Sequence, residues 1–177
     1  MSNSLIDQSF QPGPESFQPG PDTSRNLRDA LGRFATGITL ITTQTDQGPA
    51  GFTANSFASV SLDPALVLWS AARASARFPI FSAAKAYSIH ILAQDQSDLA
   101  ARFVRGGAGF DGLHTGTSVD GSPIFTQALA RFDCHQHSLH DGGDHLIIVG
   151  RVIRFALRDG APLLFSQGKY GQISNQP

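Results

Sequence analysis

The spacing of apolar residues first predicts a helix and then a series of strands. Leu27, Leu31 and Phe34 recur at helical spacing behind the possible capping residues Asp22-Thr23-Ser24, and Gly37 can end that helix in the left-handed conformation. Beyond Gly37 the period changes to two, as in the β-rich segment 38–43.

The same patterns predict the rest of the fold. Extended segments are expected at 51–61, 66–69, 87–92, 129–139, 145–157 and 163–165, with short helices at 78–84 and 97–103. Turns are expected at 46–49 and 141–144, and Asp159-Gly160 should form a further hairpin. Because the strands do not alternate with long helices, a mostly antiparallel barrel or sandwich is expected rather than a doubly wound parallel sheet.

The first 22 residues form a separate region. Their sequence contains a duplication, Ser-Phe-Gln-Pro-Gly-Pro-Glu at 9–15 followed by Ser-Phe-Gln-Pro-Gly-Pro-Asp at 16–22. Proline removes backbone donors and glycine resists ordering, so 1–22 is interpreted as a flexible arm, 23–172 as one domain and 173–177 as a tail. The arm is either a plain tail or a segment whose Phe10 and Phe17 dock on the domain or on a second subunit.

Composition excludes several classes of function. The 177 residues suffice for one domain, and 13 basic against 14 acidic residues give no field that would attract nucleic acid or anionic lipid. No apolar run approaches the length of a membrane span, and the N-terminus does not have the pattern of a secretory signal, so a cytoplasmic protein is expected.

Three familiar motifs are weak in this context. Residues 107–112 match Gly-x-Gly-x-x-Gly, but a predicted helix precedes them and none follows, so they are expected to form a loop and not a dinucleotide fingerprint. His135 and His137 share one face of a strand and could form half of a metal site, but no third ligand is evident, and no metal is expected. Cys134 is expected to pack inward and not to act as a nucleophile.

Residues 51–61 carry the more informative chemistry. They are small, rich in hydroxyl groups and poor in charge, as a surface for the flat flavin ring and its N1–C2=O edge requires. Ser70, Arg73, Ser75 and Arg77 follow where a strand is expected to end and a helix to begin, and they could hold a phosphate. Hydroxyl-rich strands are common, so these residues alone do not single out flavin.

Four motifs in order resemble the short-chain flavin reductase family, the reductase components of two-component flavin-dependent monooxygenases. They are Arg-Phe-Ala-Thr-Gly-Ile-Thr-Leu-Ile-Thr-Thr at 33–43, the stretch 51–64, His-Asp-Gly-Gly-Asp-His at 140–145 with Val-Gly-Arg-Val at 149–152, and Pro-Leu-Leu-Phe at 162–165. The resemblance covers about residues 25–170. It implies an FMN-binding split β-barrel of Greek-key type that forms a homodimer, with flavin at or near the subunit interface.

The resemblance also implies the positions that bind cofactor. The isoalloxazine and ribityl chain would contact Ala50, Gly51, Phe52, Thr53, Asn55 and Ser56, and the phosphate end would contact Ser70, Ala71, Ala72, Ala76 and Arg77. Arg102 and Phe103 would add contacts from a short helix. The nicotinamide pocket would be bordered by His145, the candidate catalytic residue, and by Phe165, Ser166, Gln167 and Gly168.

One segment departs from the family. Members often carry an aromatic residue, arginine and glycine after the closing Leu-Leu-Phe, whereas this chain continues Ser166-Gln167-Gly168-Lys169-Tyr170. The departure puts the choice between NADH and NADPH in doubt, and Lys169 or Arg154 are candidates to compensate.

The expected function is hydride transfer from NAD(P)H to FMN or FAD, with the reduced flavin supplied to a separate monooxygenase. In such a reaction no side chain need form a covalent bond, since the protein contributes geometry and charge stabilisation. Two alternatives remain: an electron carrier with tightly held FMN, and a flavin-binding module without significant NAD(P)H activity.

Overall fold

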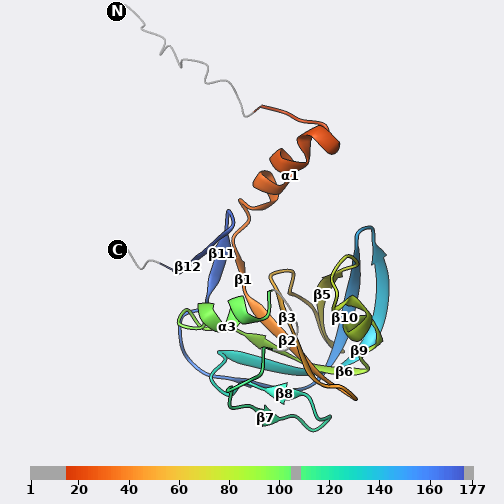
Figure 1. Ribbon diagram of the computed structural model, residues 1–177, viewed down its shortest axis with the longest axis vertical. Coiled ribbons are helices and arrows are strands. Elements are labelled where there is room, and N and C mark those ends of the chain that lie inside the picture. Colours follow the sequence, from red (N-terminus) through yellow and green to blue (C-terminus); the bar gives the residue numbers. More distant parts are fainter. Residues whose placement is uncertain (1–14, 105–108, 174–177) are drawn as a thin grey trace, which may run out of the picture.

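The computed structural model describes residues 15–104 and 109–173. Residues 1–14 of the predicted arm, including Phe10, lie outside the described residues, as do Gly107 and Ala108 of the glycine-rich motif and 174–177 of the tail. Figure 1 shows a body of curved strands, with one helix, α1, projecting from it.

Helices are few and short, as expected. They are the 3-10 turn η1 (Pro21–Thr23), α1 (Ser24–Leu31), α2 (Phe78–Ala83) and α3 (Ser97–Arg102). No helix in the described part of the chain is long and apolar enough to cross a membrane.

The predicted end of the first helix at Gly37 was wrong. The helix α1 ends at Leu31, and the Gly32 N–H bonds the Arg28 carbonyl at 2.8 Å. Thr36 and Gly37 instead form the short strand β1 (Thr36–Gly37), paired with residues of β11 (Leu164–Ser166). No residue of α1 is buried, so its apolar stripe packs on nothing within residues 15–104 and 109–173. Strand pairing determines the conformation after Leu31.

A seven-stranded, fully antiparallel sheet forms the body, which confirms the prediction of a mostly antiparallel β fold. Its spatial order is β3-β2-β6-β9-β10-β5-β4. The strands are β2 (Thr39–Thr45), β3 (Gly48–Ala54), β4 (Ala58–Leu62), β5 (Ala65–Ala72), β6 (Ala86–Ile91), β9 (Ala130–Gly142) and β10 (His145–Leu157). Small sheets are formed by β7 (Gly116–Thr117) with β8 (Pro123–Ile124), and by β1, β11 and β12 (Lys169–Gly171).

Two further predictions need correction. The single extended region expected at 51–61 is two strands, because the chain leaves β3 at Ala54 and enters β4 at the opposite edge of the sheet. The hairpin expected at Asp159-Gly160 is absent from the described strands: β11 pairs with β1 and β12 and not with β10. Both errors concern long-range pairing, which local turn signals do not encode.

The seven-stranded sheet is rolled into a barrel, because the connection between its two edge strands is too short for a flat sheet. Between Ala54 and Ala58 only residues 55–57 connect the two edge strands, a span of at most about 14 Å. In a flat sheet of this order the edges would stand about 29 Å apart. The edges therefore meet, and β3 contacts β5 across the seam.

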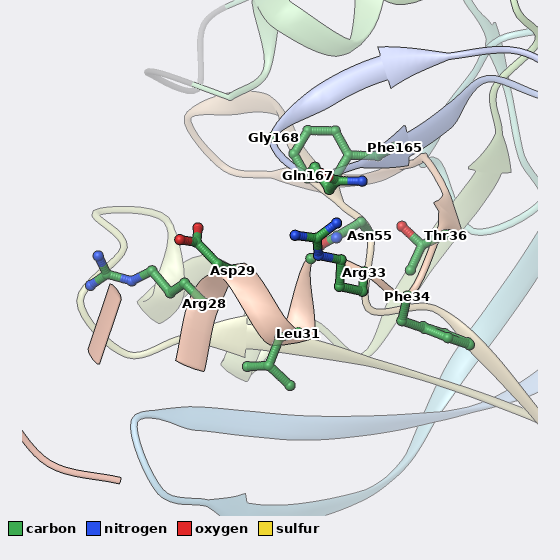
Figure 2. Close-up of a pocket in the computed structure, with 11 residues that line it drawn as sticks. Arg28, Asp29, Leu31, Arg33, Phe34, Thr36, Asn55, Phe165, Gln167 and Gly168 are labelled. Carbon is green, nitrogen blue, oxygen red and sulfur yellow. The ribbon is translucent and has the colours of Figure 1, made fainter. Parts of the chain in front are cut away.

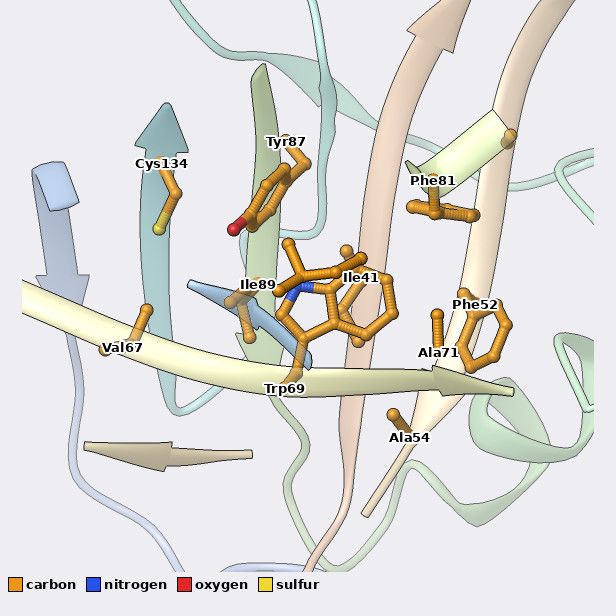
Figure 3. Close-up of a cluster of buried hydrophobic side chains, with 12 residues drawn as sticks. Ile41, Phe52, Ala54, Val67, Trp69, Ala71, Phe81, Tyr87, Ile89 and Cys134 are labelled. Atoms are coloured by element: carbon orange, nitrogen blue, oxygen red, sulfur yellow. The ribbon is translucent and has the colours of Figure 1, made fainter. Parts of the chain in front are cut away.

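Trp69 lies at the centre of the barrel core (Figure 3). Its ring centroid lies 5.6 Å from that of Phe52, 5.6 Å from that of Phe81 and 6.0 Å from that of Tyr87. Since these residues come from β5, β3, α2 and β6, one aromatic cluster holds the rolled sheet together.

A second core lies under α3. It contains Leu40, Leu92, Phe103, Phe125 and Leu163, all at most 7% exposed. Leu40 packs there while its neighbour Ile41 packs in the barrel core, so β2 is buried on both faces. The strand β2 thus connects the barrel to the layer that carries α3.

Candidate functional site

Strand β3 has one free edge, because it pairs only with β2 within the seven-stranded sheet. The Thr53 N–H donates to the Phe103 carbonyl at 3.4 Å on that free side, and Gly51 shares its orientation because alternate residues of a strand do so. The side chain of Thr53 donates to the Ala100 carbonyl at 2.8 Å. The predicted flavin stretch is therefore an edge strand docked on the end of α3.

Arg77 fixes this edge from the other side of the seam. Its Nη1 donates to the carbonyls of Gly51, at 2.9 Å, and of Phe103, while Nη2 donates to the carbonyl of Val104 at 2.8 Å. The guanidinium also lies 4.8 Å from the centre of the Phe52 ring. Partial burial lowers the pKa of Arg77 from its ordinary value, but the group stays charged near neutral pH. Most of its N–H groups therefore donate to backbone carbonyls, and the Nε–H and one N–H of Nη2 remain to bind a phosphate.

Glycine is required at position 51. A Cβ built there would lie 2.3 Å from Cδ1 of Phe103, a distance that no real side chain tolerates. The close approach lets the Phe103 ring, which is fully buried, cover the strand directly. The buried Phe103 ring therefore packs directly against the Gly51 backbone and has no exposed surface of its own.

The structure places several of the predicted flavin residues in the core. The side chains of Ala50, Phe52 and Ala71 belong to the barrel core, so they are not available to a ligand. Ser56 links the two sides of the seam: it receives the Ser70 N–H at 2.9 Å and donates to the Ser70 carbonyl at 3.2 Å. The residues expected at the ring and those expected at the phosphate are thus brought together.

A hollow of about 670 Å³ opens beside this seam (Figure 2). Asn55 lines it together with three residues predicted for the nicotinamide pocket, Phe165, Gln167 and Gly168. The last two form the turn of the β11–β12 hairpin, where both have positive φ (50° and 77°), as a two-residue turn of this kind requires. Ser166 faces away and donates to the Gly32 carbonyl at 3.2 Å.

The hollow also contains an unsatisfied polar atom. Thr36 lines it, and its hydroxyl oxygen is buried without a hydrogen-bond partner in the part of the chain that the structure describes. A buried hydroxyl without a partner destabilises the protein unless a ligand or water completes it. This atom and the neighbouring Asn55 side chain together could hold a polar ligand.

Sequence reasoning missed the charged residues of the hollow. Arg28, Asp29 and Arg33 line it from the end of α1 and the segment that follows. Arg33 belongs to a motif that carries the family resemblance, but the sequence does not show which way it points. Among the described residues that line the hollow, neither Lys169 nor Arg154, the two candidates to compensate for the missing arginine, is present.

His145 lies elsewhere. It is the first residue of β10, opposite Ala72, and its Nδ1 lies 2.7 Å from the Asp144 carboxylate, which lowers the pKa of that carboxyl. It does not line the hollow with Phe165, Gln167 and Gly168. Within one chain His145 therefore joins the group expected at the flavin phosphate.

Arg102 and Ala76 play no part in the hollow either. The Arg102 guanidinium donates to the Asp111 carbonyl at 3.0 Å, and Ala76 is exposed in the turn before α2. Cys134 is buried, as predicted, and burial raises the pKa of its thiol to about 12. His135 lies 3.1 Å from Asp120, and within residues 15–104 and 109–173 no cluster of three or more His, Cys, Asp or Glu residues is placed to hold a metal ion.

Comparison with known proteins gives a consistent result. The family described as flavin reductase like domain matches residues 31–174. The FMN reductase (NADH) SmoA of Agrobacterium fabrum is 50% identical over 173 residues, which cover 98% of this chain and 99% of that protein. The reductase subunit HsaB of a flavin-dependent monooxygenase from Rhodococcus jostii is 41% identical over 151 residues, covering 84% of this chain and 77% of that protein.

Solved structures agree on the fold. The NADH:FAD oxidoreductase SgcE6 of Streptomyces globisporus, in complex with NAD and FAD fragments, superposes with a TM-score of 0.83 at 31% identity, over 90% of this chain and 98% of that one. The expected split β-barrel is confirmed. The chain belongs to the flavin reductase like family and is an NAD(P)H:flavin oxidoreductase.

Proposed function

We propose that this chain oxidises NADH, reduces FMN, and releases the reduced flavin to a separate flavin-dependent monooxygenase. The identity of 50% with an NADH-dependent FMN reductase supports the cofactor pair, and the similarity to a monooxygenase reductase subunit supports the partner. The observation that carries the proposal is the hollow next to the end of β3, which is lined by Asn55 and the β11–β12 hairpin and holds the Thr36 hydroxyl, unpartnered within the described residues.

The flavin ring would lie along the edge of β3. The Gly51 N–H and the Thr53 carbonyl, which face the same edge as the groups bonded to Arg77 and Phe103, would contact the isoalloxazine. Ala50 and Phe52 would lie beside it in the strand, and the side chains of Asn55 and Ser56 would lie at the ribityl chain. The phosphate would be held near Ser70, Ala71, Ala72 and Ala76 by the remaining donors of Arg77, which is pinned to three carbonyls.

The protein's part in the reaction is to position and to shield. A bound flavin would supply the hydride acceptor, and stacking of the nicotinamide on it would make the transfer effectively unimolecular. The Phe165 ring, half-buried at the hollow and 5.8 Å from the ring of Tyr170, would cover the nicotinamide and exclude water. Arg102 and Phe103 would act through α3, as supports of the Gly51 backbone.

We also propose that the active form is a homodimer in the cytoplasm, where pyridine nucleotides are regenerated. Large apolar side chains are exposed at the end of α1, in the segment after it and at the end of β10, among them Leu31 at 67%, Phe34 at 79% and Leu157 at 75%. Such exposure is uncommon in a monomer and typical of a subunit interface. A dimer would also let His145 of one chain approach the hollow of the other, which a single chain does not allow.

The test is steady-state oxidation of NADH and of NADPH, each with added FMN, FAD, riboflavin or no flavin. Turnover that depends on added flavin, fastest with NADH and FMN, supports the proposal. A protein that purifies yellow and shows no turnover with any pair would instead be an electron carrier. Light scattering of the same sample gives the oligomeric state, and a monomeric active enzyme would refute the dimer.

A further inference from the structure

The hollow beside β3 has an uneven distribution of charge. Its charged lining residues in the described chain are Arg28, Asp29 and Arg33. Figure 2 shows Arg28 and Asp29 spread along the rim on α1, whereas the guanidinium of Arg33 points into the space beneath Gln167 and beside Asn55. Arg33 is therefore the cation that faces a ligand in the hollow.

Several arginines of the described chain are tied to a partner, whereas Arg33 is not. Arg73 is paired with Asp141 at 2.7 Å, and Arg131 with Asp133 at 3.1 Å. Within the described residues the side chain of Arg33 makes neither an ion pair nor a hydrogen bond, and the residue is exposed. An arginine held at a hollow with all five donors free is suited to bind a phosphate group.

The substrates offer two sources of phosphate. The flavin phosphate is expected at the turn before α2, where Arg77 and the Ser70 region lie, and those residues do not line the hollow. The second source is the pyrophosphate of the nicotinamide dinucleotide, whose nicotinamide is expected between Asn55 and the β11–β12 hairpin. Arg33 lies beside both of these elements.

We propose that Arg33 binds the pyrophosphate of the nicotinamide dinucleotide and so sets the affinity for the hydride donor. This inference rests on the proposed function of the hollow. It assigns to α1 and the segment after it a direct part in substrate binding. It also supplies, from the opposite side of the hollow, the positive charge that the hairpin residue Gln167 lacks.

The experiment measures binding without turnover. NAD⁺ is titrated calorimetrically into the wild-type protein and into Arg33→Gln, and FMN affinity is measured separately by quenching of flavin fluorescence. Loss of a charged hydrogen-bonded contact should raise the Kd for NAD⁺ about tenfold or more and leave the Kd for FMN within about twofold. Arg25→Gln, at an exposed arginine of α1 that does not line the hollow, is the matched control and should change the Kd for NAD⁺ by less than about threefold.

A relocated charge sharpens the test. The double variant Arg33→Gln/Gln167→Arg restores a guanidinium to the same space from the hairpin, and it should recover most of the lost NAD⁺ affinity. Arg33→Lys should recover only part, because an ammonium cannot form the paired contacts of the guanidinium. Circular dichroism checks that each variant is folded.

Two outcomes would overturn the inference. An unchanged Kd for NAD⁺ in Arg33→Gln would remove Arg33 from the dinucleotide site. A rise in the Kd for FMN alone would assign Arg33 to the flavin phosphate. Failure of the proposed function looks different, since the wild-type protein itself would then show no flavin-dependent NADH oxidation.

Discussion

Arg77 should contribute to stability as well as to cofactor binding, and the size of that contribution follows from its contacts. The variant Arg77→Met keeps most of the stem but removes hydrogen bonds to the carbonyls of Gly51, Phe103 and Val104 and the contact with the Phe52 ring. A hydrogen bond from a charged donor is worth about 1.5–3 kcal/mol, and a cation–π contact about 0.5–2 kcal/mol.

These contacts cannot simply be added, because Arg77 is only partly buried and water will replace some of them. We expect a loss of about 3 kcal/mol in the free energy of unfolding. With a urea dependence of about 2 kcal/mol per molar, the unfolding midpoint should fall by about 1.5 M. The unfolding midpoint of Arg77→Lys, which keeps the charge but not the planar set of donors, should lie between those of the wild type and Arg77→Met.

Equilibrium unfolding in urea, followed by the fluorescence of Trp69, measures the loss. The Kd for FMN, measured in parallel, should also rise, since the carbonyl of Gly51 is held in place by Arg77. If Arg77→Met unfolds within about 0.5 kcal/mol of the wild type while FMN binding is lost, the guanidinium serves the phosphate alone and the reasoning is refuted.

The remaining predictions concern packing, pH and the turn histidine. Gly150→Ala places a Cβ 2.4 Å from the Tyr87 hydroxyl and should lower the free energy of unfolding, measured in urea, by about 1–3 kcal/mol. The control Gly37→Ala, whose Cβ would meet nothing within 4 Å, should lower it by less than about 0.5 kcal/mol. Equal effects of the two variants would contradict the packing argument. Burial lowers the pKa of His90 from 6.5 to about 4, so on acidification the unfolded chain binds a proton before the folded protein does. The free energy of unfolding should therefore fall by up to about 3 kcal/mol between pH 6.5 and 4. A His90→Gln variant whose free energy of unfolding falls equally steeply with pH would exclude this cause. His145→Ala should raise the KM for NADH or slow flavin reduction with the urea midpoint unchanged, and unaltered kinetics would remove His145 from the site.

The sequence was a good guide to local structure and a poor one to distant pairing. The apolar run at 145–157, set off by the turn Asp141-Gly142-Gly143-Asp144, predicted β10 with its observed bounds, because turn residues and β-branched runs are local signals. It could not show that Ala54 and Ala58 lie on opposite edges of the sheet, since that depends on contacts across the whole chain. The end of α1 was missed for the same reason: Thr36 pairs with Phe165 far along the chain.

The candidate site shows the same division. The motif at 51–56 was predicted to contact flavin, but its residues differ in ways that only packing reveals: Phe52 is core and Asn55 is exposed at the hollow. Arg33 belongs to a motif that was recognised, but no role was predicted for it, because the direction of its side chain depends on where α1 ends. A residue type at a given spacing indicates possible chemistry, and the fold decides whether the side chain reaches it.

The short connection at 55–57 also limits how the barrel can open locally. Because it ties the two edge strands together covalently, β3 and β4 cannot drift apart, and opening at the seam must occur by local fraying around Arg77 and Ser56. Fraying at this place would expose the same backbone that the flavin is proposed to cover. A flavin bound there would close the seam, so we expect amide exchange along β3 and β5 to slow when FMN is added.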